Sequence, residues 1–200
     1  KAHSTPFITG VKVDAPQYAL AMDRVRYVGE PVAMVVARDR YLAEDALEAI
    51  AVDYQPLPPI IDPERAVDAT PLHPGTEGNV LHDRRFRYGD PETAFADAAH
   101  VVEATYSYPR NSCTPIECFC VIADYDPGLD AFEITANFQG PYTLHTIMAR
   151  SLKVPGNRMR LKTPPSSGGS FGVKQAVFPY VVALGVAARI AGRPVKWLED

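Results

Sequence analysis

Two short segments of the sequence combine polar side chains with glycines in a way that suits an anionic or oxygen-rich ligand. They are Gln139-Gly140-Pro141 and the glycine-rich loop Gly168-Gly169-Ser170-Phe171-Gly172-Val173-Lys174. Each segment follows a predicted strand and precedes a predicted helix. A helix start presents free N–H groups and the positive end of the helix dipole, and glycine lets a ligand approach the main chain closely. Taken alone, the loop is equally consistent with a tight structural turn.

The glycine-rich loop fails two nucleotide-binding motifs. A P-loop requires Gly-Lys followed directly by Ser or Thr. Here Val173 separates Gly172 from Lys174, and Gln175 stands where a hydroxyl residue would hold Mg²⁺. The dinucleotide-binding fingerprint also fails, because the glycines are not at its offsets. Neither motif therefore predicts a nucleotide site here.

The same loop does match Gly-x-Ser-x-Gly, the nucleophile elbow of serine hydrolases, with Ser170 as the nucleophile. Its place between a predicted strand and a predicted helix fits that motif too. That fold, however, places its acid and its histidine after the serine, and no histidine follows His145. A serine hydrolase is therefore an alternative interpretation in which Ser170 lacks a base in the expected order.

Cysteine, histidine and acidic residues give weaker signals. Cys118 and Cys120 share one face of a predicted strand and could bind a metal, but no second cysteine pair and no histidine at zinc spacing accompanies them. We therefore predict two core-facing thiols. Glu117 lies on the opposite face and is interpreted as solvated or hydrogen-bonded, not catalytic. Surface or capping roles are assigned to the histidines His3, His73, His82, His100 and His145.

The elements that would position these segments follow from hydrophobic periodicity and turn residues. Strands are predicted over 25–28, 32–37, 51–54, 84–88, 102–108, 117–125, 132–138, 158–162 and 195–198. Helices are predicted over 40–50 and 91–98, from Pro141, and over 175–191. The last of these is apolar nearly all round and should be buried. The proline-rich stretch 56–79 contains the predicted domain boundary, with residues 1–62 in one domain, 63–79 as linker and 80–200 in a second.

Composition excludes several classes of protein. In 200 residues, 46% are hydrophobic and 22% charged, which is typical of a globular chain and not of a disordered one. The net charge of −4 provides no basic excess for nucleic acid. No signal peptide is evident, and the apolar stretch 176–188 is shorter than the ~18 residues of a membrane span. Three cysteines form no disulfide framework, so we expect a soluble cytoplasmic protein.

Six segments, taken in order, resemble one enzyme family. They are Val25–Ala33, Val52–Pro58, Pro115–Cys118, Phe138–Tyr142, Gly168–Lys174 and Val195–Asp200. Together they resemble the large subunit of the molybdenum hydroxylases, which include xanthine dehydrogenase, aldehyde oxidase and aerobic carbon monoxide dehydrogenase. The chain starts without Met, and it resembles only part of such a subunit.

The resemblance implies an α+β fold, in which the C-terminal part of an α/β hammerhead domain precedes the first part of a mixed α+β molybdopterin-binding domain. It implies a molybdenum–molybdopterin cofactor in the cytosine dinucleotide form, with 2Fe-2S and FAD on partner subunits. The reaction would oxidise an aldehyde, an N-heterocycle or carbon monoxide, with water as the oxygen source. A non-catalytic scaffold that only packs against partner chains is the other alternative.

The resemblance also carries roles to single residues. Gln139 is similar to the glutamine that hydrogen-bonds an oxo ligand of molybdenum, and the loop is similar to one that passes over the pterin and the metal. The implied cofactor-binding residues are Gln139, Gly169, Ser170, Phe171 and Gly172. Gln175 stands at a substrate-contacting position that is acidic in the purine enzymes, which makes a purine substrate less expected. The general-base glutamate would lie beyond Asp200, and no direct metal ligand is implied. Ser170 and Val173 replace glycines of the family loop.

Overall fold

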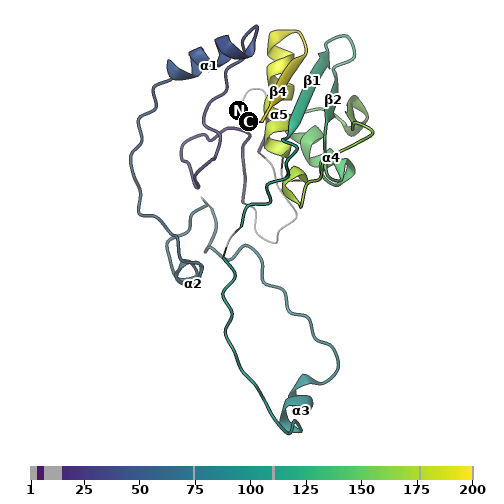
Figure 1. Cartoon of the computed structure of the whole chain (residues 1–200). Coiled ribbons are helices and arrows are strands. Elements are labelled where there is room, and N and C mark those ends of the chain that lie inside the picture. Colours follow the sequence, from purple (N-terminus) through teal and green to yellow (C-terminus); the bar gives the residue numbers. More distant parts are fainter. Residues whose placement is uncertain (1–3, 7–14, 74, 110, 176, 200) are drawn as a thin grey trace.

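The computed structural model describes residues 4–6, 15–73, 75–109, 111–175 and 177–199 (Figure 1). In chain order the elements are α1 Arg40–Glu48, α2 Pro63–Ala66, α3 Pro91–Ala96, β1 Cys120–Asp126, β2 Ala131–Ala136, α4 Pro141–Ser151, the 3-10 turn η1 Gly156–Arg158, β3 Met159–Lys162, the 3-10 turn η2 Val173–Gln175, α5 Phe178–Ala191 and β4 Val195–Leu198. His3 and Asp200, which the sequence analysis named, lie outside the described residues.

A four-stranded mixed sheet organises residues 120–198. Its strand order is β3-β2-β1-β4, with β1 antiparallel to β2 and β4, and β2 parallel to β3. The turn between β1 and β2 is held by Asp126, whose Oδ1 accepts hydrogen bonds from the N–H groups of Gly128 at 2.8 Å and Leu129 at 3.2 Å. Parallel strands need a crossover connection, and here α4 provides it between β2 and β3.

One face of this sheet carries the core. Val121 and Ala123 on β1 and Ile134 on β2 have no exposed surface, whereas Ile122 on the other face of β1 is 40% exposed. Helix α5 packs on β1 and β4, and α4 contacts both α5 and β3 (Figure 1). The α+β class is therefore confirmed, as are strands near the predicted ranges 117–125, 132–138, 158–162 and 195–198.

Helix α5 begins later than predicted. The expected helix over 175–191 starts at Phe178, with Pro179 in its first turn, while Gln175 belongs to η2. Proline suits a first helical turn, where its missing N–H costs no hydrogen bond. Residues 173–191 are apolar enough to cross a membrane by length and composition, with a mean hydropathy of 1.3. Val181, Val182 and Ala188 are nevertheless buried in the core, so α5 is the buried helix that the sequence predicted.

The first half of the chain contains the predicted helices but not the predicted strands. α1 and α3 are capped by Asp39 and Asp90, whose carboxylates accept main-chain N–H groups of the first turns. In the predicted linker, Asp62 caps the short helix α2. Figure 1 shows residues 80–109 as a long excursion from the sheet, with α3 near its far end.

Five predicted strands are wrong for the described structure. Residues 25–28, 32–37, 51–54, 84–88 and 102–108 form no strand. A strand needs a neighbour that accepts and donates its main-chain hydrogen bonds, and the described residues offer these segments none. Large side chains there stay exposed, including Val28, Val102 and Tyr106. Local composition and, at 102–108, alternating polarity thus predicted strands but could not supply a pairing partner.

Truncating Ile134 tests the core. Ile134→Ala removes three buried carbons at the centre of β2, where the side chain has no exposed surface, and should lower the free energy of unfolding by about 2–5 kcal/mol. Ile134→Val removes one carbon and should cost about 0.5–1.5 kcal/mol. Urea unfolding followed by the fluorescence of Trp197, the only tryptophan of the chain, measures both. Equal losses for the two variants would contradict a tightly packed site.

Candidate functional site

The structure brings together the two segments that the sequence singled out. Gln139 lies between β2 and α4, and the glycine-rich loop lies between β3 and η2. The N–H of Gly172 donates to Gln139 Oε1 at 2.9 Å. The N–H of Gln139 donates to the carbonyl oxygen of Lys174 at 3.4 Å. Gln139 is therefore held by the loop through both its side chain and its main chain.

The orientation of the Gln139 amide leaves a donor available. Its Oε1 accepts a hydrogen bond from the N–H of Gly172. Within the described part of the chain, no group accepts a hydrogen bond from its Nε2. Gly140 follows with a φ of 62°, a left-handed conformation that favours glycine, and caps α4. Pro141 then starts the helix. The exposed side chain of Gln139 thus presents an N–H₂ group beside the start of α4.

The loop has an unusual backbone with several free donors. Gly169, Phe171 and Gly172 have positive φ values of 88°, 52° and 101°, and a non-glycine residue such as Phe171 adopts this region rarely. The carbonyl oxygen of Ser170 accepts from the N–H of Val173 at 3.2 Å, which closes the turn before η2. The N–H groups of Gly169, Ser170 and Phe171 make no hydrogen bond to a described residue. Phe171 is 78% exposed.

Ser170 has a structural partner where a hydrolase would need a base. Its Oγ accepts a hydrogen bond from the N–H of Lys174 at 2.9 Å, in the manner of a helix cap. No described histidine bonds to it. His145 instead makes a 2.8 Å hydrogen bond between its Nε2 and the carbonyl oxygen of Met159. The geometry gives the serine hydrolase alternative no support.

The sequence analysis did not identify the ion pair between Lys174 and Glu117. Lys174 is buried, with 1% of its side chain exposed, and its Nζ lies 2.5 Å from Glu117 Oε2. Glu117 also accepts from Asn137 Nδ2 at 2.8 Å. The Lys174 ammonium, with the Asn137 amide and the N–H of Gly168, lowers the pKa of Glu117 from 4.5 to about 2. Glu117 is hydrogen-bonded, as interpreted, but as the counterion of a buried lysine.

Asn137 fixes Glu117 to the end of the sheet. Its Oδ1 accepts from the N–H of Cys120 at 3.0 Å, and its Nδ2 donates to the carbonyl oxygen of Cys118 at 2.9 Å. These bonds stand where the β1–β2 ladder would otherwise continue, since Val121 pairs with Ala136. Asn137 is buried, so the carboxylate is held by a rigid part of the fold.

Gly168 is required by the close approach of the loop to Glu117. A Cβ added at Gly168 would lie 2.6 Å from Glu117 Cβ. That atom is next to the main chain and cannot rotate away. The glycine at position 168 is thus required for a steric reason that the sequence alone could not identify.

The prediction of core-facing thiols is wrong. The core face of β1 carries Phe119, Val121 and Ala123, so alternation puts Cys118 and Cys120 on the other face. Cys118 is exposed and Cys120 half-buried. Among the described residues no group of three or more metal-binding side chains occurs. Glu117 lies in a bend before β1, and its carboxylate reaches Lys174.

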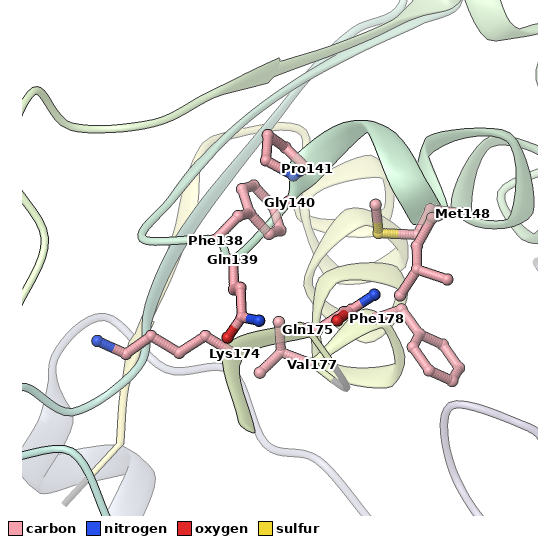
Figure 2. Close-up of a pocket in the computed structure, with 10 residues that line it drawn as sticks. Phe138, Gln139, Gly140, Pro141, Met148, Lys174, Gln175, Val177 and Phe178 are labelled. Atoms are coloured by element: carbon pink, nitrogen blue, oxygen red, sulfur yellow. The ribbon is translucent and has the colours of Figure 1, made fainter. Parts of the chain in front are cut away.

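Gln139 and Gln175 line a small hollow between α4, η2 and the start of α5. Figure 2 shows both amides beside the hollow, while Lys174 extends away from Gln175. The remaining lining residues are Phe138, Gly140, Pro141, Leu144, Met148, Lys174, Val177 and Phe178. The hollow has room for about one water molecule. The described residues therefore form a wall of a site and not an enclosed substrate pocket.

These groups fit an anionic, oxygen-rich cofactor. The hollow and the glycine-rich loop offer donors that have no partner among the described residues: Gln139 Nε2 and the N–H groups of Gly169, Ser170 and Phe171. Hydrogen-bond donors without partners are what phosphate and oxo groups require. The Lys174 ammonium is not among them, because it is committed to Glu117.

Two family models match the chain. One, described as a molybdopterin cofactor-binding domain, matches residues 72–200. The other, described as the a/b hammerhead domain of aldehyde oxidase and xanthine dehydrogenase, matches residues 3–58. The two matches are consecutive and leave a gap in the proline-rich stretch.

Curated relatives and solved structures agree with these models. The 6-hydroxypseudooxynicotine dehydrogenase complex subunit gamma of Paenarthrobacter nicotinovorans is 42% identical over 90% of this chain and 22% of that protein. The nicotine 6-hydroxylase large subunit of the same organism is 35% identical over 90% of this chain and 22% of that protein. The structure of quinoline 2-oxidoreductase from Pseudomonas putida 86 has a TM-score of 0.85 and 29% identity, covering 100% of this chain and 26% of that one. This chain thus spans about a quarter of their length.

Replacing Glu117 tests its charge. With a pKa lowered from 4.5 to about 2, the carboxylate adds stability that is complete above pH 4.5 and is lost as the pH falls towards 2. Glu117→Gln should therefore unfold more easily than the wild type at pH 7, and the difference should shrink between pH 4.5 and 2. Urea midpoints measured across this range provide the test. A difference that stays constant with pH would contradict the assignment.

Filling the space at Gly168 tests the close approach. Gly168→Ala should lower the free energy of unfolding by about 1–3 kcal/mol, because the loop or the main chain at Glu117 must move. Gly78→Ala is the matched control, since its Cβ would meet nothing within 4 Å, and should change stability by about 0.5 kcal/mol or less. Thermal unfolding of both variants measures the effect. Equal behaviour would mean that the loop is free to shift.

Proposed function

The chain belongs to the molybdopterin cofactor-binding family of aldehyde oxidase and xanthine dehydrogenase, and on this basis we propose that it forms the part of a hydroxylase large subunit that holds a molybdenum–molybdopterin cofactor. The observation that carries the proposal is the contact between Gln139 and Gly172. It uses the acceptor end of the Gln139 amide and leaves the donor end beside the free N–H groups of the loop.

In this proposal each residue has a defined task. Gln139 would donate from Nε2 to an oxygen of the cofactor, and the loop residues Gly169, Ser170, Phe171 and Gly172 would hold the cofactor, with the first three offering N–H groups that have no described partner. Gln175, on the same hollow as Gln139, contacts the substrate. When bound, the cofactor supplies a two-electron oxidation with oxygen taken from water. The chain's own residues bind and orient; the general base belongs to sequence beyond Asp200.

The proposed substrate is a nitrogen heterocycle. The names of two similar proteins include nicotine and quinoline, both of which contain a nitrogen heterocycle. Gln175 presents a neutral amide that can accept and donate a hydrogen bond, which suits a neutral heterocycle better than a carboxylate would. A substrate screen that finds oxidation of an aldehyde or of carbon monoxide instead would contradict this choice of substrate.

The proposal extends to partners, boundaries and location. The relative named as a gamma subunit of a complex supports an assembly, in which 2Fe-2S and FAD subunits would accept the electrons and the cofactor would be the cytosine dinucleotide form. The matches to residues 3–58 and 72–200 support domains over 1–62 and 80–200 joined by 63–79. Three free cysteines suit a reducing compartment such as the cytoplasm.

Metal content and turnover of the native assembly test this function. We expect about one molybdenum per chain by elemental mass spectrometry, and uptake of ¹⁸O from labelled water into a quinoline or pyridine substrate. A preparation with its partner chains but without molybdenum would contradict the proposal and favour the scaffold alternative.

Two variants of Gln139 test the donor. Gln139→Ala removes the amide, and Gln139→Glu keeps an acceptor for Gly172 but removes the N–H₂ group. Both should lower kcat by about 100-fold or more, as expected for loss of a donor aimed at developing charge, with unchanged thermal unfolding. Activity retained in Gln139→Glu would show that only the contact to Gly172 matters.

A further inference from the structure

Lys174 connects three separate parts of the site. Its Nζ lies 2.5 Å from Glu117 Oε2, its N–H donates to Ser170 Oγ at 2.9 Å, and its carbonyl oxygen accepts from the N–H of Gln139 at 3.4 Å. The first partner precedes β1, the second belongs to the loop and the third precedes α4. One residue thus links the sheet, the loop and the start of a helix.

Lys174 depends on this ion pair more than Glu117 does, because a buried ammonium requires a partner for its charge. Lys174 is 1% exposed while Glu117 is 37% exposed, measured on their side chains. An uncompensated buried charge is costly, whereas a well-packed apolar pair is often no less stable than a buried ion pair. The ion pair is therefore weak evidence for stability. Its distinctive effect is that the loop cannot shift without separating Lys174 from Glu117.

The anchor at the far end is rigid. Glu117 is held by Asn137, which is bonded to Cys120 and Cys118 at the end of the β1–β2 ladder. The near end is Gln139, bonded to the carbonyl oxygen of Lys174 and to the N–H of Gly172. Hydrogen bonds, together with the Lys174 side chain between two of them, thus connect the sheet to the main-chain N–H of Gln139.

We infer that Lys174, paired with Glu117, is a positioning residue that sets the orientation of the Gln139 amide donor through the glycine-rich loop. This inference rests on the proposed function for its catalytic consequence, because Gln139 is assigned there to the cofactor. It adds that the orientation is determined by the Lys174–Glu117 ion pair, in which Glu117 is not one of the residues that line the hollow.

The test separates positioning from stability in the assembled, full-length enzyme. Glu117→Gln leaves the Lys174 ammonium buried without its counterion and should lower the unfolding temperature. The double variant Lys174→Met/Glu117→Gln removes both charges and should recover that temperature. If Lys174 positions the loop, the double variant should still exchange the Gly172 amide hydrogen at least tenfold faster than the wild type. Its kcat should also stay about ten- to hundredfold lower than that of the wild type, with KM within about twofold.

A second lysine–glutamate ion pair, whose side chains are 40% and 44% exposed and which lies away from the loop, provides the control. Lys162 Nζ lies 2.5 Å from Glu133 Oε1, between β3 and β2. Lys162→Met/Glu133→Gln removes it and should leave Gly172 exchange and kcat at wild-type values. Loss of kcat in both double variants would mean that ion pairs act only through general stability.

Two further results would overturn the inference. One is recovery of stability, Gly172 exchange and kcat together in Lys174→Met/Glu117→Gln. The other is unchanged Gly172 exchange in every Lys174 and Glu117 variant. Hydrogen exchange, measured by mass spectrometry on the peptide over 167–175, needs no cofactor. An enzyme that lacks molybdenum but shows faster exchange would refute the proposed function while supporting the positioning of the loop.

Discussion

The ammonium of Lys174 is buried, and the arrangement of the site depends on its neutralisation by Glu117. A charge with so little exposure is tolerated only with a partner and hydrogen bonds. Glu117 can serve because Asn137 and the N–H of Gly168 hold its carboxylate in place and, with Lys174, lower its pKa to about 2. The glycine at 168 follows from the same contact, since a larger residue would collide with Glu117.

The sheet gives this ion pair its fixed reference. β1 and β2 are paired along six residues each, and Asn137 ends that ladder with its side chain. The loop, in contrast, has positive φ values at Gly169, Phe171 and Gly172, and the carbonyl oxygen of Ser170 accepts from the N–H of Val173 in the turn before η2. A rigid sheet end and an irregular loop are thus joined through side chains, and Gln139 takes its position from both. This is the arrangement expected where a fold must present main-chain donors to a ligand.

Much of the second half of the chain follows from local pattern. The strand segments that became β1, β2 and β4, the Pro141 helix start and the apolar character of α5 were predicted within a few residues. Local pattern was insufficient where the partner is distant in sequence. The segments 25–28, 32–37 and 102–108 were predicted as strands from their residue types but have no strand neighbour among the described residues. The cysteines at 118 and 120 were placed on the wrong face, because periodicity gives alternation but not which face meets the helices.

The sequence by itself determined the family, the α+β class and the two segments at Gln139 and Gly168–Lys174, because these depend on residue types at short spacing. Only the tertiary structure decided which atoms meet. It paired Lys174 with Glu117, 57 positions apart, and Gln139 with Gly172, 33 positions apart. The physical reason is that burial and a hydrogen bond between distant residues arise only when the sheet and loop pack together. A lone glutamate and a lone lysine in the sequence carry no sign that they will do so.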